Sequence, residues 1–159
     1  MRTRMILLGA VALASLAACG TSSGHGQHAA AAGQPAAAPA AEVHIQVEES
    51  SLGQILTDQN GRTLYAFVND KGGTSSCTGD CIATWPALVS RQPVTAGTGA
   101  EKSLLAQTIR TEGTAQATYN NWPLYYYVGD VGPGDVDGQG VDGAWFVVGT
   151  DGKLIKTAP

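Results

Sequence analysis

Two aromatic segments alternate between two apolar faces, as strands covered on both sides do. In TLYAFV, Tyr65 and Phe67 share one face, and the intervening apolar residues form the other. PLYYYV repeats this pattern with Tyr125 and Tyr127 on one face. Aromatic and β-branched residues are frequent in strands. Both segments are therefore predicted to be strands that are buried on both faces.

The rest of the domain has the short apolar runs and turn signals of an all-β protein. Further strands are predicted at 43–47, 54–57, 105–110, 116–119, 145–149 and 153–156. Asn, Asp and Gly residues predict turns at 58–61, 112–113 and 151–152. The helical candidate is a short turn at 81–85, which Pro86 ends. The pattern favours a small all-β sandwich or barrel-like domain.

The domain repeats itself with a displacement of 60 residues. The matching positions are Leu64, Tyr65, Phe67, Val68, Asp70 and Trp85 in the first half and Leu124, Tyr125, Tyr127, Val128, Asp130 and Trp145 in the second. Such a match at one offset predicts two copies of one β unit. We expect the domain at 43–159 to contain pseudo-symmetric repeats of about 60 residues, near 43–100 and 101–159. Phe67 and Tyr127 are expected to occupy equivalent buried sites.

The N-terminus has the pattern of a secretory signal. Arg2 and Arg4 precede an uncharged segment, residues 5–18, which is shorter than the roughly 20 residues of a membrane-spanning helix. The ending Leu-Ala-Ala-Cys resembles the bacterial lipobox, in which the cysteine thiol, here of Cys19, is acylated and becomes the mature N-terminus. Residues 1–18 are thus predicted to be a signal peptide. An ordinary signal with an incidental cysteine is the alternative.

A Gly, Ala, Ser, Pro and Gln-rich segment follows, residues 19–42, and is predicted to be a flexible tether. The processed chain has 7 basic and 13 acidic residues, so its net charge is −6. No basic patch is visible, which argues against nucleic acid and against electrostatic docking on anionic lipid. We expect the acyl chains alone to hold the protein to the membrane.

The repeated motif also has a family resemblance. LYAFVND and LYYYVGD fit the pattern Tyr-x-(Phe/Trp/Tyr)-x-x-Asp, and together with CTGDCIATWPAL they resemble the secreted-repeat bacterial lipoproteins. The resemblance covers most of residues 50–152. It implies a lipid-anchored envelope protein with tandem repeats, and no established activity. Asn121 departs from the pattern, because the family often has Gly in this turn.

Cys77 and Cys81 are the two cysteines that remain once Cys19 is acylated. An even pair in an exported protein predicts a disulfide, and a spacing of four permits the short Cα separation that a disulfide needs. The alternative is a redox or copper site that also uses His25 and His28 of the tether. Against that alternative, the sequence has no histidine after His44.

Four aspartates lie in one Gly-rich segment: Asp130, Asp135, Asp137 and Asp142. Clustered carboxylates suit Ca²⁺, but the bidentate Glu and the flanking helices of an EF-hand are missing. An Asp-capped loop is therefore the preferred interpretation, and no metal site is predicted.

Catalytic candidates are few. After His44 the domain has no histidine, so no Ser-His-Asp or Cys-His pair is expected inside the repeats. Asp70 and Asp130 could act as an acid–base pair, but carboxylates at strand ends more often accept backbone hydrogen bonds.

The sequence therefore predicts a non-enzymatic binding or interaction module of the cell envelope, anchored outside the cytoplasm by lipid. Neither a cofactor nor a catalytic residue is expected, and a protein or small-molecule partner is left open. Envelope redox or copper handling is the alternative function.

Overall fold

The structure, a computed structural model, describes residues 42–157. The predictions for the signal segment, Cys19, His25 and His28, and for nearly all of the tether, lie outside these residues. Among residues 42–157, no helix is both long enough and apolar enough to cross a membrane.

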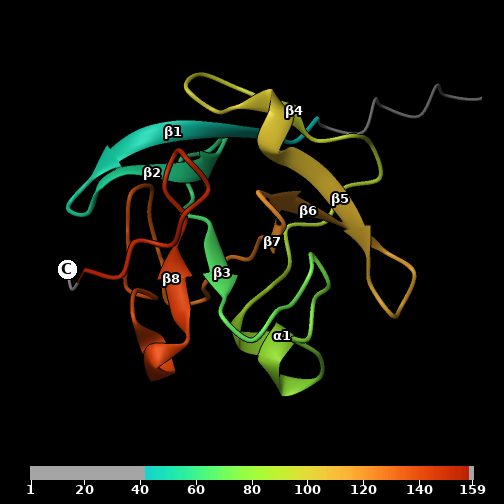
Figure 1. Cartoon of the computed structure of the whole chain (residues 1–159). Helices are drawn as coiled ribbons and strands as arrows, with labels where there is room; N and C mark the ends of the chain where they lie inside the picture. The colour runs from blue at the N-terminus through green and yellow to red at the C-terminus, as the bar shows by residue number, and fades with distance from the viewer. Residues whose placement is uncertain (1–41, 158–159) are drawn as a thin grey trace, which may run out of the picture. The chain divides into compact units, whose positions relative to one another are not determined.

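Each repeat begins with an antiparallel hairpin (Figure 1). In the first repeat β1 (His44–Ser50) pairs with β2 (Gly53–Asp58), and β4 (Thr95–Ala96) joins the other edge of β1 in parallel. In the second repeat β5 (Leu105–Ile109) pairs with β6 (Ala115–Tyr119). A short strand, β7 (Trp122–Pro123), continues the second sheet beyond β6.

A third sheet contains one strand from each repeat. β3 (Tyr65–Phe67) lies antiparallel to β8 (Trp145–Val147), with Phe67 opposite Trp145 (Figure 1). The helical elements are short: α1 (Asp80–Thr84), η1 (Lys102–Leu104) and η2 (Val141–Gly143). The all-β assignment is therefore confirmed, with the strands distributed over three small sheets.

Most predicted strands are present, but two are not. The hairpin strands, the TLYAFV strand and the strand at 145–149 have counterparts in β1, β2, β5, β6, β3 and β8. PLYYYV was predicted to be a regular strand and is not one, because Tyr125 N donates to Tyr65 O whereas Tyr126 N donates to Pro86 O. The segment 153–156 makes only one isolated bridge, Val148 to Leu154.

Backbone hydrogen bonds display the pseudo-twofold relation between the repeats. Tyr65 N donates to Tyr125 O, and Tyr125 N donates to Tyr65 O, both at 2.9 Å. Farther out, Val68 N donates to Ala144 O at 2.9 Å, and its counterpart Val128 N donates to Thr84 O at 3.1 Å. Each aromatic motif thus pairs with the C-terminal part of the other repeat. Two pseudo-symmetric repeats are confirmed.

The turns that follow β2 and β6 differ. Asn120 and Asn121 have φ values of 48° and 63°, so they form a two-residue turn with positive φ at both positions. After β2 the chain instead turns at Gly61, which has a φ of 77°, and Asp58 N donates to Arg62 O across a longer loop. Asparagine tolerates the left-handed conformation, which explains why the second turn does not require glycine.

Candidate functional site

Four aromatic rings form one continuous stack across the pseudo-twofold axis. Trp85 and Trp145 lie at its centre, with ring centroids 3.9 Å apart and an interplanar angle of 2°. Phe67 stacks on Trp145 at 4.4 Å, and Tyr127 packs on Trp85 at 4.4 Å with its ring tilted by 30°. Each outer ring therefore packs on the tryptophan of the other repeat, which joins the two repeats at this point.

The stack is covered at its centre and open at its ends. Trp85 and Trp145 are each 3% exposed, whereas Phe67 and Tyr127 are only half-buried. Their equivalence and their packing against one shared core are as predicted, but both rings are only partly buried where buried sites were expected. The buried tyrosines of the motif are Tyr65 and Tyr125, because each motif segment leaves the core two residues after its first tyrosine.

A groove of about 560 Å³ runs along this stack between α1 and η2. We call it the aromatic groove, and its lining residues come from both repeats: Phe67, Asn69, Asp80, Cys81, Thr84, Trp85, Tyr127, Val141, Asp142, Ala144 and Trp145. Asp80 and Asp142 are its two charged residues, and both are exposed. Asp142 has a φ of 55°, a left-handed conformation that is uncommon outside glycine.

The motif tyrosines and aspartates form two pairs that cross between the repeats. The Tyr125 hydroxyl donates to Asp70 Oδ2 at 2.7 Å, and the Tyr65 hydroxyl donates to Asp130 Oδ2 at 2.8 Å. The two carboxylates that were considered as an acid–base pair therefore have different tyrosine partners. Burial is the main cause that raises the pKa of both phenols, and the neighbouring carboxylate raises it further.

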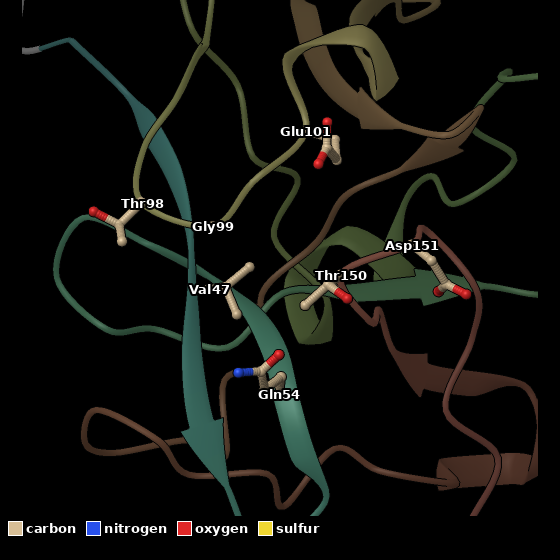
Figure 2. A pocket seen from close by; sticks show the side chains of 7 residues that line it. All are labelled: Val47, Gln54, Thr98, Gly99, Glu101, Thr150 and Asp151. Carbon is tan, nitrogen blue, oxygen red and sulfur yellow. The ribbon is translucent and has the colours of Figure 1, made fainter.

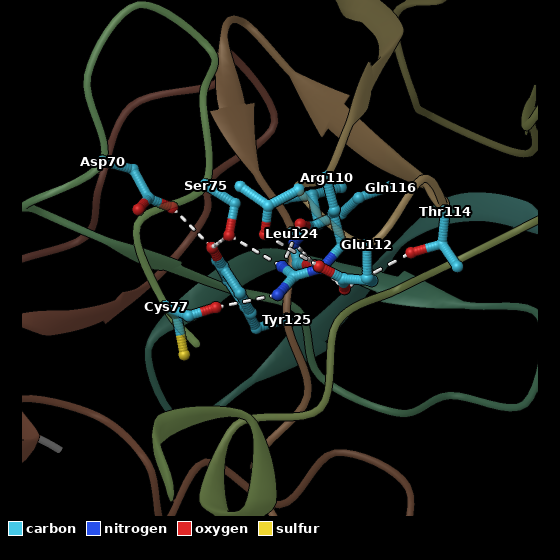
Figure 3. A network of polar contacts seen from close by, with 10 residues as sticks. Asp70, Ser75, Cys77, Arg110, Glu112, Thr114, Gln116, Leu124 and Tyr125 are labelled. Carbon is cyan, nitrogen blue, oxygen red and sulfur yellow. Dashed lines mark hydrogen bonds and ion pairs between the residues drawn. The ribbon is translucent and has the colours of Figure 1, made fainter. Parts of the chain in front are cut away.

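Asp70 belongs to a buried polar network. It is 3% exposed, and its Oδ1 accepts from Ser76 N and Ser76 Oγ, each at 2.7 Å. The Tyr125 hydroxyl also lies 2.7 Å from Ser75 Oγ, which connects the pair to a buried guanidinium (Figure 3). This end of the molecule is thus held by side chains from both repeats.

The guanidinium belongs to Arg110, which is 6% exposed. It donates to Ser75 Oγ, Gln116 Oε1 and the carbonyl of Cys77 at 2.7 to 2.8 Å, and it pairs with Glu112 (Figure 3). Sequence reasoning placed Arg110 at a strand end without a role. The signal for a buried, partnered arginine is its place in the sequence, because Arg110 is the one charged residue of the predicted strand at 105–110. A buried arginine needs hydrogen-bond partners.

Asp130 has a different environment. It is half-buried, and its Oδ1 accepts from Asp137 N at 3.0 Å. Burial is the largest cause that raises the pKa of Asp130 to about 6, and the charges of Asp137 and Asp135 add to the effect. Gly138 N donates to the Tyr65 hydroxyl at 3.2 Å. Backbone N–H groups therefore surround the Tyr65–Asp130 pair, where Arg110 lies near the Tyr125–Asp70 pair.

Cys77 and Cys81 form the predicted disulfide, with a Cα separation of 5.3 Å. Cys77 is buried, and its carbonyl is the Arg110 acceptor described above, whereas Cys81 lines the aromatic groove. The disulfide therefore fixes the segment between the polar network and the groove. In this form the two sulfurs are bonded to each other and offer no thiolate to a metal.

The aspartates of the Gly-rich segment have separate hydrogen-bonding roles. Asp135 Oδ2 accepts from Val131 N at 2.9 Å and from Gly132 N at 2.7 Å, as expected for a loop cap. Asp142 lies in η2 at the aromatic groove. Between residues 42 and 157, no three His, Cys, Asp or Glu residues are arranged to hold a metal ion.

A second pocket, of about 410 Å³, lies beside the first hairpin (Figure 2). Glu101 and Asp151 are its acidic residues, and Val47 and Gln54 come from β1 and β2. Lys153 neutralises Asp151 through an ion pair of 2.6 Å. No aromatic side chain lines this pocket, so it offers a ligand no ring to stack on, unlike the aromatic groove.

Comparison with known families agrees with the internal repeat. Residues 46–89 and 107–149, more than half of the chain, each match a family described as a secreted repeat of unknown function. No curated protein and no solved structure matches the chain significantly. The two matched segments contain both aromatic motifs, both tyrosines of the Tyr–Asp pairs and both central tryptophans. The chain therefore belongs to this family of secreted repeats, which places its repeats outside the cytoplasm.

Proposed function

We propose that this protein is a lipid-anchored, non-enzymatic binding module of the cell envelope and that the aromatic groove is its binding site. The observation that carries the proposal is the partial exposure of Phe67 and Tyr127 at the two ends of the ring stack. Rings that served only the core would gain more stability from complete burial. Partly exposed rings over rigid, buried neighbours instead provide apolar contact area for a ligand.

The surroundings of the groove support a preorganised site. The disulfide holds α1 on one side, and the backbone hydrogen bonds of Val68 and Val128 hold both walls at Ala144 and Thr84. A site of this kind loses little conformational entropy when a ligand binds, which favours affinity. The polar groups at its rim would then fix the orientation of the ligand.

A comparison of what the lipidated protein retains through purification tests the binding role. Full-length protein is extracted from membranes in a polyoxyethylene detergent, and bound components are identified by mass spectrometry. Phe67→Leu and Tyr127→Leu should lose a component that the parent protein retains. Phe146→Leu is the matched control, because Phe146 is a half-buried ring of β8 outside the groove. Retention of the same components by all variants would contradict the proposal.

Membrane anchoring is proposed to depend on acylation of Cys19. The Cys19→Ser variant should accumulate as an unprocessed precursor and should not incorporate labelled palmitate. Partition between detergent and aqueous phases gives an independent measurement, since two or more acyl chains are needed for stable anchoring. A mature-sized, labelled band from the variant would contradict the lipobox interpretation.

A further inference from the structure

We infer that the ligand of the aromatic groove is an organic cation with an ammonium or guanidinium group. This inference rests on the proposed function, because it assigns a ligand class to the same groove. Aromatic rings and carboxylates both attract such a group, whereas neither attracts an anion. The groove presents both kinds of side chain within one lining.

The charges of the groove are of one sign. Asp80 and Asp142 line it, and no lysine, arginine or histidine does. Within residues 42–157, neither carboxylate has a side-chain hydrogen bond or an ion pair. By contrast, Asp151 in the second pocket is neutralised by Lys153. The groove thus presents two solvent-exposed negative charges with no paired cation among the described residues, and a cationic ligand would complement both.

The two carboxylates are also independent features of the repeats. With the displacement of 60 residues, the position equivalent to Asp80 is Gly140, and the position equivalent to Asp142 is Ile82. Each repeat therefore contributes one acidic residue at a position where the other repeat has none. They reach the same groove because α1 and η2 face it from its two sides.

The ring stack supplies the second part of the recognition. Trp85 and Trp145 cover one another's faces, so the faces open to a ligand are at the ends of the stack, on Phe67 and Tyr127. A cation over an aromatic face at an exposed site is attracted by the ring quadrupole, which raises affinity about two- to fivefold. The mature chain's excess of acidic residues would also steer cations toward the protein.

Titration of the full-length protein in a polyoxyethylene detergent tests the inference. The probes are spermidine, tetramethylammonium and, as a neutral ligand of similar reach, maltotriose. Calorimetry and tryptophan emission report binding. The Asp80→Asn/Asp142→Asn variant should bind spermidine on the order of tenfold more weakly than the parent. Tyr127→Leu should bind it about threefold more weakly, and added salt should weaken the parent's binding.

The Glu101→Gln/Asp151→Asn variant is the matched control, since it removes the same net charge from the second pocket. Its affinity for spermidine should stay within about twofold of the parent's. Equal losses in both double variants would overturn the inference, because the attraction would then be non-specific. Groove-dependent binding of maltotriose alone would also overturn it while leaving the proposed function intact. If no probe binds, and if Phe67→Leu and Tyr127→Leu retain the same co-purifying components as the parent, both the cation inference and the proposed binding function are contradicted.

Discussion

Asp70 and Asp130 accept the same hydrogen bond, from the tyrosine of the opposite repeat, in two different environments. Asp70 is buried and linked through Ser75 to Arg110, which is buried as well. Asp130 is half-buried, has acidic neighbours and has its pKa raised to about 6. The two repeats therefore share the Tyr–Asp hydrogen bond between them and differ in the groups that surround each aspartate.

The comparison of Asp70 with Asp130 shows which residues of one repeat are constrained by contact with the other repeat. A tyrosine of one repeat and an aspartate of the other must fit together, so both motif residues recur with the 60-residue period. The outer partners of each aspartate come from local loops, and these loops differ in sequence. The Asp70 end consequently holds the two repeats together through buried groups, whereas the carboxylate of Asp130 at the other end is accessible to solvent and can titrate.

The largest difference between the two ends should appear on removal of the buried cation. Arg110→Met leaves the carbonyl of Cys77 and Gln116 Oε1 without their guanidinium donor, whereas Ser75 keeps its contact with the Tyr125 hydroxyl. Because each unsatisfied buried acceptor costs about 1 to 3 kcal/mol, we expect a loss of about 3 to 5 kcal/mol in the free energy of unfolding, measured in urea. Arg62→Met is the control, because the exposed Arg62 only covers the Tyr126 ring and should cost about 1 kcal/mol. Equal costs would remove the distinction between the ends.

The outer rings should behave alike in the two repeats. Phe67→Ala and Tyr127→Ala should each cost about 2 kcal/mol, which is less than the roughly 3 to 5 kcal/mol of a fully buried ring, because each is half-buried. Urea midpoints measure both losses. A cost near 5 kcal/mol for one variant alone would show that this ring belongs to the core and that the groove is not symmetric.

The tyrosine hydroxyls should sharpen the contrast. Tyr125→Phe leaves the buried Asp70 without one donor and should cost about 1.5 kcal/mol. Tyr65→Phe should cost about 1 kcal/mol, since water can reach the half-buried Asp130 and only the long hydrogen bond from the buried Gly138 N loses its acceptor. Thermal or urea unfolding of both variants gives the comparison. A larger loss for Tyr65→Phe would reverse the assignment of the two ends.

The smallest expected effect is a pH dependence confined to Asp130. Its folded pKa lies near 6, above the unfolded value, so the proton stabilises the folded state. This contribution is complete below about pH 4 and is lost as the pH rises through about 6. The loss should stay below about 1 kcal/mol, because the group is partly solvated. Asp130→Asn should flatten this slope in urea titrations from pH 4 to 7, and an unchanged slope would contradict the assignment.

Much of this fold could be predicted because local patterns carry it. Alternation identified the hairpin strands, Pro86 ended the helical turn, and the cysteine spacing indicated the disulfide. PLYYYV was assigned incorrectly for a non-local reason. Its residues bond in turn to Tyr65 and to Pro86, so the segment is extended without being a regular strand.

The sequence by itself determined the repeat, the all-β class and the pairing of the cysteines, because each depends on spacing along the chain. Only the tertiary structure decided that Tyr65 is buried while Phe67, on the same face, reaches the groove. Periodicity specifies the face of a strand but not the depth at which each residue lies. Partners such as Arg110 and Cys77 are 33 residues apart, and only the packing of the two repeats brings such groups together.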